Sequence, residues 1–164
     1  MRTKLTVLAF SLSAVMATSA FAGDIKPLHG GFTGDLTSGF PKKDKLKGVC
    51  PTGTSPAVAS VKARVKDRAP VQTPVVRVIV RKLSTNSCAS SVAASGLLQS
   101  DTVDGDATFS GVSSVAAVNG TPFMIEVDKT STTSNAAELY ELDYHCENGT
   151  LDHPVPALTY CQNQ

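Results

Sequence analysis

The sequence predicts an all-β protein, an antiparallel β-sandwich of about six or seven short strands. Several segments alternate between apolar and polar residues, which is the pattern of a strand with one buried face. Gly, Pro and Asn-Gly pairs interrupt these segments at short intervals, as tight turns require. Only 5% of the residues are aromatic and Trp is absent. We therefore expect a core of Val, Ala, Leu and Ile, packed between two sheets.

The N-terminus has the parts of a secretory signal peptide. Arg2 and Lys4 precede an apolar run, Leu5 to Val15, and a small-x-small sequence ends at Ala22. This run is about half of the ~20 residues that cross a bilayer, so we predict export without a membrane anchor, to the periplasm or the exterior. The predicted parts of the chain are the signal peptide (1–22), a Gly- and Lys-rich lead-in and loop (23–55) and the sandwich domain (56–164).

Five segments of the predicted domain have strand character. The clearest is 59–66, where Val and Ala on one face alternate with Ser, Lys and Arg on the other. The other four are 75–83, 107–118, 121–129 and 138–146. The segment 88–99 is ambiguous, because its Ala residues favour one short helix whereas its Ser residues favour a loop or a weak strand.

An even number of cysteines in an exported chain predicts two disulfides. The four are Cys50, Cys88, Cys146 and Cys161. We favour Cys146–Cys161, which closes a loop of about 15 residues worth ~3 kcal/mol, and this choice leaves Cys50–Cys88. The alternative is a zinc site that includes His145 and His153. It lacks C-x-x-C spacing, and the adjacent His145 and Cys146 would point to opposite faces of a strand.

The sequence Tyr144-x-Cys146 resembles the tyrosine corner of immunoglobulin domains, in which a Tyr stands two residues before the second cysteine. The likeness covers three residues, and the core Trp of those domains is missing. It implies an immunoglobulin-like sandwich and no particular activity.

Charge is segregated along the chain. Without Arg2 and Lys4, 13 basic residues stand against 14 acidic ones. From Lys42 to Lys82, 11 Lys or Arg face two Asp, whereas from residue 83 onward a single Lys faces ten carboxylates. The two parts of the chain therefore carry about +9 and −9.

The alternating pattern directs five of the cations outward from two predicted strands. They are Lys62, Arg64, Lys66, Arg77 and Arg81. If the two strands pair, the five share one surface that suits an anionic glycan or lipopolysaccharide, or the acidic half of a second molecule head to tail. The alternative is that acidic rows on neighbouring strands neutralise them. Nucleic acid is not expected, because no aromatic residues are interleaved with the cations.

No motif predicts catalysis or a cofactor. Asp101, Asp104 and Asp106 are candidate calcium ligands, although their spacing departs from D-x-D-x-D-G. Ser113, His145 and Asp152 could be assembled into a triad, but no G-x-S-x-G elbow accompanies them. We therefore predict an exported binding or assembly module of the cell envelope or extracellular space, with a protein or anionic glycan as partner. The alternative is a small secreted enzyme inhibitor, or an enzyme, acting through an exposed loop.

Overall fold

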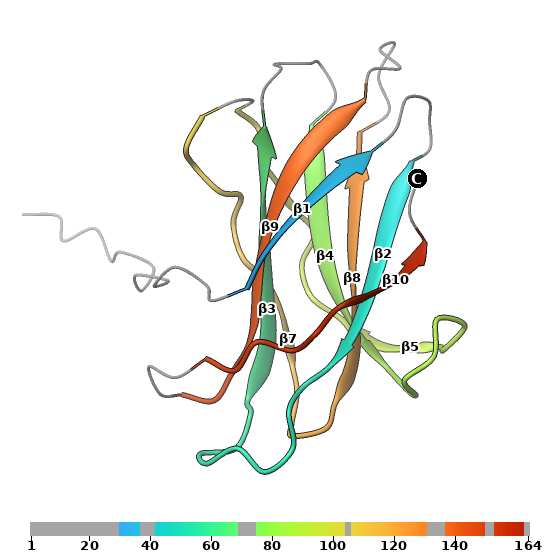
Figure 1. Ribbon diagram of the computed structural model, residues 1–164, viewed down its shortest axis with the longest axis vertical. Coiled ribbons are helices and arrows are strands. Elements are labelled where there is room, and N and C mark those ends of the chain that lie inside the picture. The colour runs from blue at the N-terminus through green and yellow to red at the C-terminus, as the bar shows by residue number, and fades with distance from the viewer. Residues whose placement is uncertain are drawn as a thin grey trace, which may run out of the picture.

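The computed structural model describes six stretches of the chain: 30–36, 42–68, 75–103, 106–130, 137–149 and 153–162. The predicted signal peptide, the possible calcium ligand Asp104 and the triad candidate Asp152 lie outside these residues. The described part contains strands and connections but no helix (Figure 1). The short helix considered for 88–99 is therefore not formed.

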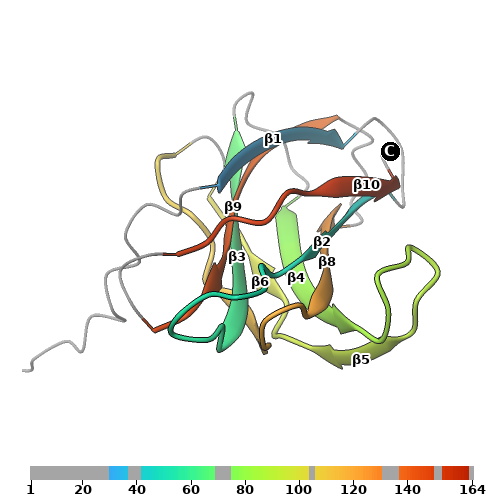
Figure 2. The same cartoon turned by 60° about the horizontal axis from the view of Figure 1, so that its bottom comes forward.

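Two antiparallel sheets pack face to face, which confirms the predicted sandwich (Figure 2). The first sheet has the strand order β1 (Gly30–Leu36), β9 (Glu138–Glu147), β3 (Ser60–Arg68) and β7 (Ser113–Ala116). The second has the order β10 (Thr159–Gln162), β2 (Lys43–Val49), β8 (Pro122–Lys129), β4 (Val76–Leu83) and β5 (Val92–Ser95), and β6 (Gln99–Ser100) also pairs with β4. The described residues thus form ten strands, more than the six or seven predicted.

The additional strands lie where the sequence pattern is weak. Strands β1 and β2 belong to the lead-in, so both sheets include residues before position 56. Strands β5 and β6 replace the ambiguous segment 88–99, whose backbone pairs with the edge of β4. The four residues of β5 are all exposed, so backbone pairing with β4 rather than a buried face holds them in place.

The predicted alternation of buried and exposed side chains is confirmed in the segments with the clearest pattern. Inward residues of β3 and β4 are buried, among them Val61, Val65, Val76 and Val80, while their neighbours are partly exposed. In β9, Tyr140, Leu142, Tyr144 and Cys146 all belong to the core.

Glycine in two strands makes room for the few aromatic rings of the core. Gly34 in β1 pairs with Tyr140, and a Cβ at Gly34 would overlap the tyrosine ring. Gly48 in β2 pairs with Phe123, where an added Cβ would lie 2.6 Å from the phenyl Cζ. The hydroxyl of Tyr140 then reaches across to the second sheet and donates a hydrogen bond of 2.7 Å to the buried Asp44 carboxylate.

Both predicted disulfide pairings are wrong, although both disulfides form. Cys50, just after β2, bonds to Cys146 of β9 and joins the two sheets, with a Cα–Cα distance of 5.8 Å. Cys88, in the loop after β4, bonds to Cys161 of β10. Loop length predicts how much a disulfide lowers the entropy of the unfolded chain. The folded sandwich decides which cysteines lie close enough for their sulfur atoms to bond. Because all four thiols are oxidised, the zinc alternative has no thiolate ligands.

Candidate functional site

The five cations singled out in the sequence do not share one surface. Strands β3 and β4 belong to different sheets, so Lys62, Arg64 and Lys66 lie on the outer face of the first sheet. Arg77 and Arg81 lie on the outer face of the second. Each group therefore has its own acidic neighbours.

On the first sheet, three of the four cations of β3 face three carboxylates of β9, and the fourth, Arg68, is exposed at the end of the strand opposite Leu139. Arg64 and Lys66 pair with the residues directly opposite, Asp143 and Glu141, at 2.8 Å each. Lys62 forms an ion pair with Glu147 in the same ladder. The Phe109 ring covers this row, with its centroid 4.5 Å from the Arg64 guanidinium carbon and 4.8 Å from the Lys66 ammonium. Each of the three predicted cations of this face therefore has its own carboxylate, as the neutralising alternative predicts.

The outer face of the second sheet is different, because three neighbouring strands line up their charged side chains in its central part. Their register aligns them in three rows: Lys43–Asp128–Arg77, Lys45–Glu126–Ile79 and Lys47–Met124–Arg81. Five of these nine positions are cationic and two are anionic. We call Lys43, Lys45, Lys47, Arg77 and Arg81 the basic face.

The two carboxylates are shared among three of the five cations. Asp128 accepts hydrogen bonds from the guanidinium of Arg77 at 2.8 and 3.0 Å. Glu126 lies 3.3 Å from the Lys43 ammonium and 3.1 Å from Arg81 Nε. Among the described residues, the side chains of Lys45 and Lys47 have no carboxylate partner. The basic face therefore keeps an excess of about three positive charges.

Sequence reasoning missed the contribution of β2. The cluster at Lys43, Lys45 and Lys47 has the two-residue spacing of a strand face, which was the available signal. It was obscured because two of the inward positions between and beside these lysines are Asp44 and Gly48 instead of Val or Leu. In the folded protein the Tyr140 hydroxyl bonds to Asp44, and the Phe123 ring lies against Gly48.

A buried histidine lies at one end of the ladder of ion pairs between β3 and β9. His145 of β9 is 2% exposed, because the chain after β9 folds back over it and Cys146 N–H donates to the Pro154 carbonyl at 3.0 Å. Its ring centroid is 4.5 Å from that of His153, and its Nε2 is 3.8 Å from the Glu147 carboxylate. Burial, followed by the charges of His153 and Lys62, lowers the pKa of His145 to about 4 against the opposing effect of Glu147. The Lys62 ammonium in turn holds the pKa of Glu147 below its ordinary value.

The remaining candidate residues have structural contacts. The Asp101 carboxylate accepts bonds from the backbone N–H groups of Asp67 (2.7 Å) and Val103 (3.3 Å), and Asp106 accepts one from Thr108 N–H at 2.6 Å. The bonds to Val103 and Thr108 are typical of turn formation, whereas the bond from Asp67 ties the Asp101 turn to β3. The described residues contain no acidic, His or Cys cluster suited to a metal. Ser113 is fully buried, and its hydroxyl accepts a bond from Val80 N–H.

No known family model matches this chain, and no curated protein is significantly similar to it. Within the described stretches there is also no helix long and apolar enough to cross a membrane. With no matching family or curated protein to suggest a function, the excess positive charge of the basic face is the strongest indication of one.

Proposed function

We propose that this protein is an exported module that binds an anionic glycan, such as lipopolysaccharide or an acidic polysaccharide, through the basic face. The observation that carries the proposal is the excess of cations over carboxylates on the three central strands of the second sheet. A polymer with regularly spaced charges can contact several strands of such a surface at once. Each contact adds a screened attraction, so affinity depends on the array and not on one residue.

The side chains around the cations favour a glycan over a nucleic acid. The two uncharged positions of the three rows are Ile79 and Met124, so the rows contain no aromatic ring on which a base could stack. Two disulfides also fit an oxidising compartment outside the cytoplasm. Together with the signal-peptide pattern, this supports a location in the periplasm or outside the cell, where envelope glycans are the abundant polyanions.

Self-association through opposite charges has less support. The acidic strands that would have to face a second molecule already neutralise cations of their own chain, in the ladder of the first sheet and at Asp128 of the second. The basic face keeps a local positive excess that the carboxylates on its own strands do not neutralise. An external anion complements it better than a second copy does.

The test compares two double variants that remove the same charge from different sheets. Lys45→Gln with Lys47→Gln removes the two lysines of the basic face that have no carboxylate partner, and Lys62→Gln with Lys66→Gln is the matched control. Heparin serves as the probe in titrations at about 10 and 150 mM salt, where the Debye length falls from ~30 to ~8 Å. Melting temperatures establish that both variants are folded.

We expect wild-type binding to weaken as salt rises. At low salt, the Lys45/Lys47 variant should bind at least about tenfold more weakly, and the control should change by less than about twofold. Absence of heparin binding at low salt would refute the proposal. An equal loss in both variants would mean that net charge and not the basic face is responsible.

A further inference from the structure

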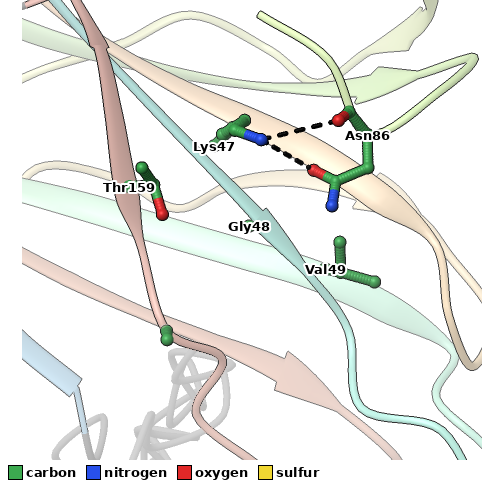
Figure 3. A pocket seen from close by; sticks show the side chains of 6 residues that line it. Lys47, Gly48, Val49, Asn86 and Thr159 are labelled. Carbon is green, nitrogen blue, oxygen red and sulfur yellow. Dashed lines mark hydrogen bonds between the residues drawn. The ribbon is translucent and has the colours of Figure 1, made fainter.

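A hollow of ≈ 250 Å³ lies at one end of the basic face. It is bordered by β2, by the loop after β4 and by the chain entering β10 (Figure 3). Its lining residues are Lys47, Gly48, Val49, Asn86, Ala157 and Thr159. Small-molecule sites are usually ~300–1,000 Å³, so the hollow suits one substituent of a larger ligand better than a whole small molecule.

The charge in this hollow is held by neutral oxygens. The Lys47 ammonium donates to the Asn86 side-chain oxygen at 3.3 Å and to the Asn86 carbonyl at 3.5 Å (Figure 3). These bonds are long and exposed, and they leave the positive charge without a counter-charge. By contrast, Lys43 at the other end of β2 has the Glu126 carboxylate as its partner. An anion entering the hollow would form an ion pair with the Lys47 ammonium, and the neutral Asn86 oxygens cannot supply that opposite charge.

Further donors border the same space. Asn86 carries a side-chain amide nitrogen besides the oxygen that faces Lys47. Thr159 stands directly opposite Lys47 in the pairing of β10 with β2, so its hydroxyl lies on the same side of the sheet. An ammonium, an amide and a hydroxyl around one space suit a tetrahedral oxyanion, whose oxygens diverge in several directions.

The walls of the hollow are fixed before any ligand arrives. Asn86 stands two residues before Cys88 and Thr159 stands two residues before Cys161, and the disulfide between these cysteines ties the loop to β10. The loop is also bonded internally, with Thr85 N–H donating to the Ser90 hydroxyl at 2.9 Å and Ser84 N–H to the Ser91 carbonyl at 3.0 Å. A preformed site loses less entropy when it binds.

We propose that this hollow binds a sulfate or phosphate substituent of the glycan held by the basic face, with Lys47, Asn86 and Thr159 as its donors. The proposal rests on the proposed function and adds a preference to it. The basic face alone attracts any polyanion, whereas the hollow selects glycans that carry tetrahedral oxyanions over those that carry only carboxylates. The Cys88–Cys161 disulfide is then part of the binding site as well as of the fold.

The first experiment uses the inorganic ions and does not depend on the glycan. Sodium sulfate and sodium phosphate are titrated separately into isotope-labelled full-length protein at constant ionic strength, with chloride as the reference. Saturable shifts are expected at the Asn86 side-chain amide and at the backbone amides of Lys47 and Thr159. Lys47→Ala should abolish them, whereas the matched Lys45→Ala should retain them. Absence of saturable shifts with both ions would overturn the proposal, whatever heparin does.

The second experiment uses heparin, a phosphorylated mannan and polygalacturonate, which carry sulfate, phosphate and carboxylate groups. Lys47→Ala and Asn86→Ala should weaken binding of the sulfated or the phosphorylated polymer about tenfold and of polygalacturonate about twofold, and the more affected polymer identifies the substituent. Lys45→Ala should affect all three alike. If Lys47→Ala also weakens all three alike, the basic face binds glycans but the hollow is not selective. Replacing Cys88 and Cys161 with Ser should remove the preference while the other disulfide keeps the sheets joined.

Discussion

Acid should destabilise the fold through His145, and the size of the effect follows from its surroundings. In the folded protein its pKa is about 4, compared with ~6.5 in an unfolded chain. The neutral ring is therefore favoured by folding, and this contribution is complete above about pH 6.5 and is lost as the pH falls toward 4. Linkage gives a loss of about 2 kcal/mol between pH 7 and pH 5, where most carboxylates are still ionised.

Urea unfolding followed by circular dichroism at about pH 7 and pH 5 measures this loss directly. His145→Leu keeps a similar volume, removes the titrating group and should reduce the difference between the two pH values to a few tenths of a kcal/mol. His153→Leu, at the neighbouring ring, is the control and should keep most of the loss. If His145→Leu loses as much stability as the wild type, burial of this ring is not the cause of the acid sensitivity.

Three further predictions concern stability. Gly34→Ala should destabilise the fold by about 2–3 kcal/mol, because the new Cβ meets the Tyr140 ring. Gly31→Ala in the same strand, where an added Cβ has nothing within 4 Å, should change the urea midpoint little; equal effects would contradict the steric account. Arg64→Ala should cost about 2 kcal/mol in urea unfolding, because Asp143, which is 8% exposed, loses its counter-charge; a loss below about 0.5 kcal/mol would contradict this. Non-reducing peptide mapping should recover the two disulfide pairs described above, and replacing the inter-sheet pair, with its sequence separation of 96, should cost about 4–5 kcal/mol; a Cys50–Cys88 peptide would refute the pairing.

The fold class and the orientation of the clearest strands could be predicted from the local residue pattern. In 59–66 and 138–146, side chains alternate with a period of two, and a sheet with one buried face requires that period. The local pattern is sufficient in these segments because the polarity of each residue indicates whether its side chain is buried or exposed. Two oxidised cysteine pairs were also predictable, since an even count in a chain with a signal-peptide pattern indicates disulfides.

Which strands pair, and which cysteines and charges meet, follows from the packing of the sandwich. The lysines of β2 had the spacing of a strand face, but the inward Asp44 and Gly48 hid the strand. Other strands bring Tyr140 and Phe123 beside these two residues. Likewise, the pairing of β8 with β2 and β4 put two carboxylates among five cations on one face. The packing of distant strands also brings each cysteine next to its disulfide partner. Such pairings join residues more than a hundred positions apart, such as Gly30 with Tyr144, and no local pattern records which strand will lie alongside which.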